Sequence, residues 1–262
     1  MKAIFTLFLT TILICKISFG QSATGCTDAT SQQLEKTIFI YGGMIDRVFI
    51  RYILALTHKP DPKICFIPTA SADREAGINM WYEYCTNLPL RPSVLRTFIN
   101  SSPEQKTFEE EILTSDAIIV GGGNTLNMIA IWKAQGIDTL LRKAYDEGIV
   151  LAGGSAGSLC WFAQGYSDSR PKYLSIIKGL GFLDFSHSPH YNNYERRTSF
   201  LKAIADGRLK PGYGCDNLAG LLFVNGILKK SVSQNAGDNN YFVSLIDGKV
   251  NEELLPAEII KE

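Results

Sequence analysis

Residues 149–162 read Ile149-Val-Leu-Ala-Gly-Gly-Ser-Ala-Gly-Ser-Leu-Cys-Trp-Phe162, which is an apolar run, a glycine-rich turn and a second apolar run. The first run, 149–152, has the length and composition of a buried strand, and the second, 159–162, continues a helical pattern. Between them, Ser155 stands in the pattern Gly-x-Ser-x-Gly. After a strand and before a helix, this pattern is typical of a nucleophile elbow, a sharp turn that holds a serine hydroxyl above a sheet. A structural serine or a phosphate-binding turn is the alternative.

Apolar runs of the same kind flank this stretch and alternate with amphipathic segments. The candidate strands are 37–41, 63–68, 94–99, 116–120 and 149–152. Strands that are apolar throughout and separated by helices indicate a parallel sheet covered on both faces. Later in the chain, Asn225-Gly226 between apolar runs predicts an antiparallel hairpin, and Asp247-Gly248 after the run 241–246 predicts another. The sequence therefore predicts a single α/β domain with antiparallel hairpins at its C-terminal end.

The N-terminus has the pattern of an export signal. Met1-Lys2 precedes an apolar run, 3–15, and small residues follow near Ser18 and Gly20. That run is shorter than the roughly 20 residues that span a bilayer. We expect a signal peptide at 1–20, a flexible leader at 21–34 and the α/β domain at 35–262. The mature chain would then be secreted or periplasmic, without stable membrane insertion, and a retained anchor is the alternative.

Composition excludes several classes of function. The chain has 26 basic and 26 acidic residues, so no overall charge attracts nucleic acid. Six cysteines become five if Cys15 leaves with the signal, and an odd number leaves at least one free thiol. The sequence leaves open whether the remaining cysteines form one disulfide, and their spacing does not identify the two partners. No Cys/His cluster has metal-ligand spacing, so we expect no metal or other cofactor. Whether the protein forms a homodimer is also open.

A second glycine cluster, Gly121-Gly-Gly-Asn-Thr125, follows the predicted strand 116–120. It is not a dinucleotide fingerprint, because Leu126 stands where the last glycine should be. Successive glycines let backbone N–H groups approach an anion or a carbonyl oxygen closely. We expect the N–H of Gly123, together with that of Ala156, to donate to an oxyanion. Gly122 and Asn124 are candidates for binding the backbone of a substrate.

The chain has three histidines, which narrows the search for a general base. His58 lies in a segment rich in prolines and charges, which is typical of a surface loop. His187 and His190 lie together in 185–193, where Pro189 restricts the backbone just before His190. His190 is therefore the candidate base for the elbow serine. A loop histidine with a structural hydrogen bond is the alternative.

Two aspartates are candidates to orient the imidazole. Asp216 lies just before the first predicted hairpin, and Asp168 lies in Tyr166-Ser-Asp-Ser169. A catalytic triad needs an acid that accepts a hydrogen bond from the second ring nitrogen of the base. Either aspartate could instead cap a helix or a turn. The sequence leaves the choice between them open.

These motifs together resemble peptidase family S51, which contains peptidase E (an aspartyl dipeptidase) and cyanophycinase. The resemblance runs from about Lys36 to Gly226. It rests on the Gly121 and Gly153 clusters, on 166–169, on Ser188-Pro-His-Tyr191 and on the segment around Asp216. It implies a flavodoxin-like, doubly wound sheet of the class I glutamine amidotransferase kind.

The resemblance also implies functional roles. Ser155 would be the nucleophile and His190 the base, and Asp216 stands where the family commonly has a glutamate. Asp168 matches a further aspartate suspected of a catalytic part. Peptidase E cleaves short peptides after an N-terminal aspartate, and Arg196 falls near the arginine that receives that acidic side chain. The familiar members are mostly cytoplasmic, so the predicted export signal is a departure from the family.

The prediction is therefore a serine peptidase that hydrolyses short peptides, with acidic residues before the scissile bond, through an acyl-enzyme. Two alternatives stay open. One is a cyanophycinase-like hydrolase of β-aspartyl-arginine links, and the other is a non-catalytic exported binding protein of the same fold. A class I amidotransferase is disfavoured, because Ser155 occupies the elbow position where those enzymes have cysteine.

Overall fold

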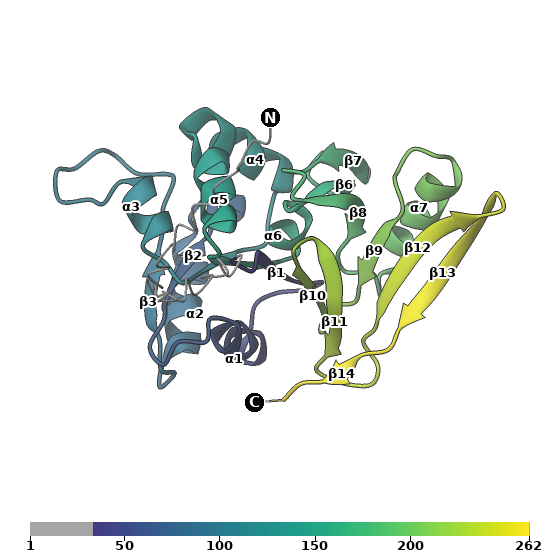
Figure 1. Cartoon of the computed structure of the whole chain (residues 1–262). Helices are drawn as coiled ribbons and strands as arrows, with labels where there is room; N and C mark the ends of the chain where they lie inside the picture. Colours follow the sequence, from purple (N-terminus) through teal and green to yellow (C-terminus); the bar gives the residue numbers. More distant parts are fainter. Residues whose placement is uncertain (1–33, 262) are drawn as a thin grey trace, which may run out of the picture. The chain divides into compact units, whose positions relative to one another are not determined.

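The structure, a computed structural model, describes residues 34–261. These residues form two β-sheets with helices packed on them (Figure 1). The predicted export signal at 1–20 and the predicted leader at 21–34 lie outside the described residues, except for Leu34. Within residues 34–261, no helix is long and apolar enough to cross a membrane.

The larger sheet has eight strands in the order β14-β11-β10-β1-β5-β4-β2-β3. Its strands are β1 (Thr37–Tyr41), β2 (Lys63–Ile67), β3 (Arg91–Val94), β4 (Ala117–Val120), β5 (Val150–Gly154), β10 (Ala219–Val224), β11 (Ile227–Ser233) and β14 (Glu258–Ile259). The five strands from β1 to β3 in this order run parallel, whereas β10 is antiparallel to β1 and to β11. The predicted α/β class, with a mostly parallel sheet and later antiparallel strands, is confirmed.

Helices connect the parallel strands and cover both faces of this sheet, except α7 (Tyr194–Ala205), which packs on the second sheet. The helices are α1 (Arg47–Leu56), α2 (Glu75–Cys85), α3 (Phe108–Leu113), α4 (Thr125–Gln135), α5 (Ile137–Asp146), α6 (Ala156–Leu159), α7 (Tyr194–Ala205) and the short 3₁₀ turn η1 (Thr69–Ser71). Side chains alternate along each strand, so one strand serves two cores. In β4, Ile118 packs with residues of α4 and α5, whereas Ile119 packs with residues of α1 and α2.

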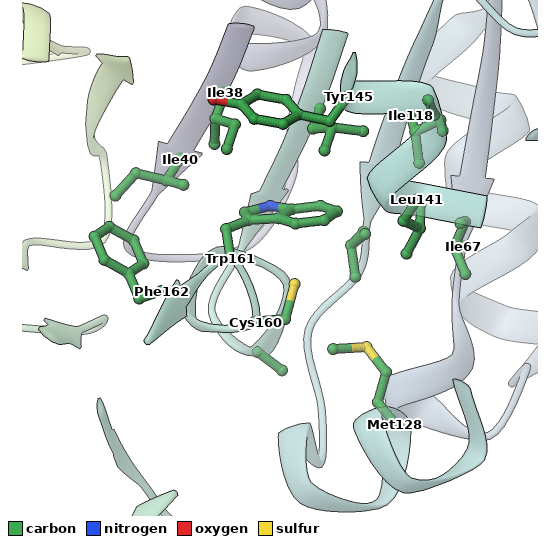
Figure 2. Packing of buried hydrophobic residues seen from close by; sticks show 14 of the residues in the cluster. Ile38, Ile40, Ile67, Ile118, Met128, Leu141, Tyr145, Cys160, Trp161 and Phe162 are labelled. Carbon is green, nitrogen blue, oxygen red and sulfur yellow. The ribbon is translucent and has the colours of Figure 1, made fainter. Parts of the chain in front are cut away.

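Figure 2 shows the first of these cores from close by. Trp161 lies at its centre beside Ile38, and Tyr145 and Leu141 come from α5. Trp161 is fully buried, and so are Ile38 and Leu141. Burying such side chains is the main favourable contribution to folding, because each is worth roughly 1.5 to 3 kcal/mol when it leaves water.

The second sheet has six strands in the order β13-β12-β9-β8-β6-β7. Its strands are β6 (Phe162–Ser167), β7 (Ser175–Lys178), β8 (Leu183–Ser188), β9 (Gly212–Cys215), β12 (Asn240–Ile246) and β13 (Lys249–Leu255). Strands β6, β8 and β9 are parallel, and the other pairs are antiparallel. Helix α7 packs on this sheet through Phe200 and Ile204. The apolar pattern in the sequence did not reveal this second sheet.

The predicted helical run 159–162 is wrong. Helix α6 ends at Leu159, and β6 begins at Phe162. The carbonyl groups of 160–162 accept hydrogen bonds from the backbone of 180–183 instead of from a following helical turn. Packing of the aromatic side chains Trp161 and Phe162 in the core therefore outweighs the local helical pattern.

The predicted strand at 94–99 is also displaced, because β3 is Arg91–Val94. Beyond Leu95, the backbone turns toward the carboxylate of Asp73, which accepts hydrogen bonds from the N–H groups of Thr97 and Phe98. In a longer strand, the N–H groups of Thr97 and Phe98 would have been available to bond a neighbouring strand. Here they donate to the Asp73 side chain instead, so the strand ends earlier.

Both predicted hairpins are present. Strands β10 and β11 are joined by Asn225 and Gly226, and β12 and β13 by Asp247 and Gly248. All four turn residues have positive φ, as the tightest two-residue hairpin turns require. At the other end of β10, the segment 216–218 leads from β9 toward the carboxyl ends of the parallel strands. The candidate site lies at that edge.

Candidate active site

Ser155 follows β5 directly and stands at the start of α6. Its φ of 53° and ψ of −115° lie in a sparsely populated region for a residue with a side chain. The turn is over-determined by packing, because a Cβ on Gly157 would come within 2.1 Å of the Val120 carbonyl oxygen on β4. The N–H of Ser155 also donates to the carbonyl of Tyr41 on β1, at 3.3 Å. These restraints hold the Ser155 side chain at the carboxyl edge of the sheet.

His190 comes to the same point from the second sheet, just after β8. Its Nε2 lies 2.8 Å from Oγ of Ser155, which is hydrogen-bond distance. Its φ is 52°, and its N–H donates to the carbonyl of Gly42, which follows β1. The next residue, Tyr191, donates its N–H to the Cys215 carbonyl at the end of β9. The structure thus joins the two sheets at the serine and histidine that the sequence singled out.

The other ring nitrogen of His190 contacts Asn217. Its Nδ1 lies 2.7 Å from Oδ1 of Asn217, in the segment between β9 and β10. An amide oxygen can only accept a hydrogen bond, so Nδ1 carries the proton and Nε2 is free to accept from the serine hydroxyl. The serine, the histidine and the asparagine form one hydrogen-bonded chain.

The expectation that Asp216 or Asp168 contacts the imidazole is therefore corrected. Asp216 is 4% exposed and directs one carboxylate oxygen to the N–H of Asn239, at 2.8 Å. Its other oxygen has no partner within residues 34–261. Burial raises the pKa of Asp216 above its ordinary value. The chain turns at 216–219, where the N–H of Ala219 donates to the Asp216 carbonyl at 3.1 Å, so Asn217 faces the histidine while the Asp216 carboxylate faces Asn239.

Asp168 follows β6 and pairs with Arg196 instead. Arg196 Nη2 lies 2.6 Å from Asp168 Oδ2, and the Arg196 side chain is 12% exposed whereas that of Asp168 is 66% exposed. These two residues border a polar hollow with His190, Asn193 and Asn217. The structure thus brings the predicted substrate arginine next to the base, although Asp168 is bound to it rather than to the imidazole.

The charge around His190 favours the neutral ring. Its pKa is lowered, first by burial and then by the nearby Arg196 cation, whereas the hydrogen bond that His190 donates to Asn217 and the Asp168 carboxylate act in the opposite sense. Burial disfavours the charged imidazolium because the charge loses water. A neutral imidazole with a free Nε2 is the form that can accept a proton from Ser155 at neutral pH.

A second histidine, His187, stabilises the elbow from the second sheet. The sequence analysis assigned no role to it. His187 is fully buried, and its Nδ1 lies 2.9 Å from the Tyr213 carbonyl oxygen. Its Nε2 lies 2.9 Å from the hydroxyl of Ser158, one helical turn after Ser155. Burial lowers the pKa of His187 to about 3. The ring is therefore neutral, donates from Nδ1 and accepts from Ser158, which anchors α6 to the second sheet.

The glycine cluster after β4 borders the elbow. A Cβ on Gly122 would lie 3.2 Å from Ser155 Cβ and 3.6 Å from its Oγ. Gly123 has a φ of 140°, and a Cβ there would come within 2.2 Å of the Ala70 carbonyl oxygen. Within residues 34–261, the N–H groups of Gly122, Gly123 and Ala156 donate to no protein acceptor. Donors without partners beside a serine hydroxyl are suited to an oxyanion.

The side chain of Asn124 makes hydrogen bonds within the protein. Its Oδ1 accepts from the N–H of Asn127 at 3.0 Å and caps α4, and its Nδ2 donates to the Ser169 carbonyl at 3.0 Å. Its side-chain groups are thus already used within the protein. Asn124 shapes the glycine cluster by joining it to the segment that carries Asp168.

Metal ligands and disulfides are absent from the described part of the chain. Within residues 34–261, no three His, Cys, Asp or Glu side chains gather in a way that could hold a metal ion. The cysteines of this part, Cys65, Cys85, Cys160 and Cys215, are free thiols and are buried. The chemistry that the described site offers is that of a serine, a histidine and an asparagine.

Comparison with known proteins identifies relatives of this chain. The sequence profile of peptidase family S51 matches residues 45–230. An uncharacterized peptidase of Bacillus subtilis, YgaJ, is 38% identical over 211 residues, which cover 80% of this chain and 90% of that protein. Peptidase E of Shewanella denitrificans is 30% identical over 140 residues, or 51% of this chain and 55% of that protein. The chain thus matches YgaJ over most of its length and this peptidase E over about half.

Among solved structures, the crystal structure of a peptidase from an acI-B1 Actinobacterium superposes with a TM-score of 0.66. The match covers 87% of this chain and 97% of that chain at 16% sequence identity. This likeness concerns the fold, and the predicted flavodoxin-like architecture is confirmed.

Proposed function

This chain belongs to peptidase family S51 and is a peptidase, and from that premise we propose that it is a serine peptidase whose nucleophile is Ser155. The observation that carries the proposal is the hydrogen-bonded chain from Ser155 Oγ to His190 Nε2, at 2.8 Å, and from His190 Nδ1 to Asn217, at 2.7 Å. A nucleophile, a base and a group that orients the base within hydrogen-bond reach are the requirements of acyl transfer.

The first step is attack on the peptide carbonyl carbon. His190 Nε2 takes the hydroxyl proton of Ser155 as Oγ bonds to that carbon, and the carbonyl oxygen becomes negative. The free N–H groups of Ala156 and of Gly122 or Gly123 stabilise this oxyanion. Asn217 keeps the ring in the tautomer that can accept the proton, and it stabilises the imidazolium less than a carboxylate would.

The second step breaks the carbon–nitrogen bond. The imidazolium gives its Nε2 proton to the leaving amine, and the acyl group stays on Ser155. Water then attacks the ester with His190 again as base, which releases the new carboxylate and restores the serine hydroxyl. Each proton transfer passes through one atom, Nε2 of His190, which exchanges protons in turn with Ser155 Oγ, the leaving amine and the attacking water.

We further propose that the residue before the scissile bond is acidic, as the resemblance to peptidase E implies. Arg196 is largely buried at the polar hollow beside His190, and within residues 34–261 its guanidinium pairs with Asp168. A guanidinium has five N–H donors, so others are left for a substrate carboxylate. The exposed Asp168 carboxylate suits the ammonium group at the N-terminus of a short peptide.

The test is the hydrolysis of a panel of Asp-Xaa dipeptides by the unaltered protein and by Ser155→Ala. We expect kcat/KM to fall by about 10⁴-fold or more, because the nucleophile is lost. Ser101→Ala, at an exposed serine outside the site, should keep full activity. A fluorophosphonate probe should label the unaltered protein and the control but not Ser155→Ala. A folded Ser155→Ala variant that still hydrolyses the panel would overturn the proposal.

A further inference from the structure

A cavity of about 290 Å³ opens beside Ser155, next to the elbow and the glycine cluster. Gly122 and Gly154 form part of its wall, and neither borders the polar hollow of His190 and Arg196. The position of a Cβ on Gly122 lies 3.6 Å from Ser155 Oγ and 3.4 Å from Sδ of Met44. Met44 also lines the cavity. The reactive oxygen therefore has two different hollows near it, and the mechanism above uses the polar one.

The wall of this cavity is mostly non-polar. Met44, Phe66, Ala76 and Met80 line it, and Met44 is 58% exposed. Apolar side chains that gather around one cavity, with a small number of polar groups among them, are typical of a ligand-binding pocket. Met side chains are unbranched and adapt to irregular apolar partners. The cavity is thus suited to an apolar group about the size of one amino-acid side chain.

One cation stands at this apolar wall. Arg74 lines the cavity and is exposed, and within residues 34–261 its guanidinium has no hydrogen-bond or ion-pair partner. Its two acidic neighbours are both engaged elsewhere. Asp73 accepts backbone N–H groups of the segment after β3, and Glu75 pairs with Arg96 at 2.7 Å. Arg74 is therefore free to bind an anionic group of a ligand in the cavity.

We propose that this cavity binds the residue after the scissile bond, that this residue is non-polar and C-terminal, and that Arg74 pairs with its free carboxylate. The inference rests on the proposed peptidase function and adds its leaving-group specificity. An apolar side chain next to a carboxylate is what the C-terminal residue of a dipeptide such as Asp-Leu presents. The acidic N-terminal residue would then lie toward Arg196, and the two residues would meet at Ser155.

Binding is measured first, because it does not depend on turnover. Calorimetric titration of Ser155→Ala uses three probes: Asp-Leu, Asp-Gly and the Asp-Leu amide, which has no C-terminal carboxylate. We expect Asp-Leu to bind about tenfold or more tightly than Asp-Gly, because the leucine side chain leaves water. We expect the amide to bind about fivefold less tightly than Asp-Leu, because the pair with an exposed arginine is lost.

Second-site variants in the same background assign these effects to residues. Arg74→Gln should weaken the binding of Asp-Leu about fivefold and leave the binding of the Asp-Leu amide unchanged. Gly77→Leu should fill the cavity, because a Cβ at Gly77 meets nothing within 4 Å and the residue lines the wall. It should weaken Asp-Leu more than Asp-Gly. Arg51→Gln, at an exposed arginine of α1 outside the cavity, should change no affinity.

Any of three results would overturn the inference. Asp-Leu could bind no more tightly than Asp-Gly, or show no detectable binding. Arg74→Gln could also weaken the binding of Asp-Leu and of its amide equally. Hydrolysis of the same dipeptides by proteins with Ser155 intact separates this failure from that of the proposed function. If Asp-Gly is hydrolysed in a Ser155-dependent manner without preference for Asp-Leu, the specificity inference alone fails. If Ser155→Ala still hydrolyses Asp-Leu, the proposed function fails.

Discussion

Asn217 Oδ1 accepts a hydrogen bond from Nδ1 of His190 at 2.7 Å, so a neutral amide stands where a catalytic triad has a carboxylate. The amide fixes the tautomer of the ring but brings no negative charge to stabilise the imidazolium. Burial, followed by the Arg196 cation, lowers the pKa of His190 below the ordinary histidine value of 6.5, although the hydrogen bond to Asn217 acts in the opposite sense.

Asn217→Asp should raise the pKa of His190, because a carboxylate favours the charged ring. The acidic limb of the pH profile of kcat/KM should therefore move to higher pH. Asn217→Leu removes the acceptor and should lower kcat/KM by about 10²- to 10⁴-fold, because the ring is no longer held in the productive tautomer. Steady-state kinetics from pH 4 to 9 checks both. Identical profiles for the three proteins would show that Asn217 has no part in holding the base.

The Arg196–Asp168 pair should tune the base in opposite directions. Arg196→Gln removes a cation that disfavours the imidazolium, so the pKa of His190 should rise. Asp168→Asn removes an anion that favours it, so that pKa should fall by a smaller amount, because Asp168 is 66% exposed and screened by water. NMR titration of the His190 ring proton reports both shifts without turnover. Shifts of the same sign in both variants would contradict this account.

Asp216 should matter for stability and not for the base. Its folded-state pKa is raised, so the folded state holds the proton more tightly than the unfolded state, and stability falls as pH rises above the ordinary value of 3.8. Asp216→Asn keeps an acceptor for the N–H of Asn239 and removes the buried charge. At pH 7 it should unfold at a urea concentration equal to or above that of the unaltered protein.

Asp216→Ala leaves the Asn239 donor without its acceptor and should cost about 1 to 3 kcal/mol. The His190-dependent limb of the kcat/KM profile should not move in Asp216→Asn. Movement of that limb would return Asp216 to the catalytic machinery.

His187 should make the fold sensitive to acid. The pKa of His187 is about 3 in the folded state, below the ordinary 6.5. At a pH between these two pKa values, the ring is protonated in the unfolded state but not in the folded state. Stability then falls with decreasing pH by about 1.4 kcal/mol per pH unit from this residue. His187→Gln should be less stable at pH 7 and should lose this part of the slope in urea unfolding between pH 6 and 4. His58→Asn, at an exposed loop histidine, should keep it.

Local patterns were sufficient for four parallel strands of the main sheet and for the hairpin turns. Buried parallel strands are apolar throughout, so β1, β2, β4 and β5 stand out from the amphipathic helices between them. Asn225-Gly226 specifies a hairpin because its residues adopt positive φ readily. Apart from the β12–β13 hairpin, the second sheet escaped because its strands β6, β8 and β9 mix polar with apolar residues or contain glycines, as in Gly212-Tyr-Gly-Cys215. Strands of that kind are defined by their partners and not by their own pattern.

The sequence by itself determined the elbow at Ser155, since Gly-x-Ser-x-Gly between a strand and a helix leaves the backbone few other conformations. It also pointed to His190, because few histidines were available. Only the tertiary structure decided that Asn217 and not Asp216 holds the ring, that Arg196 lies beside the base, and that Arg74 faces an apolar cavity. These contacts join segments far apart in the chain, and the turn at 216–219 sends the side chains of Asp216 and Asn217 to different partners, which the sequence pattern does not specify.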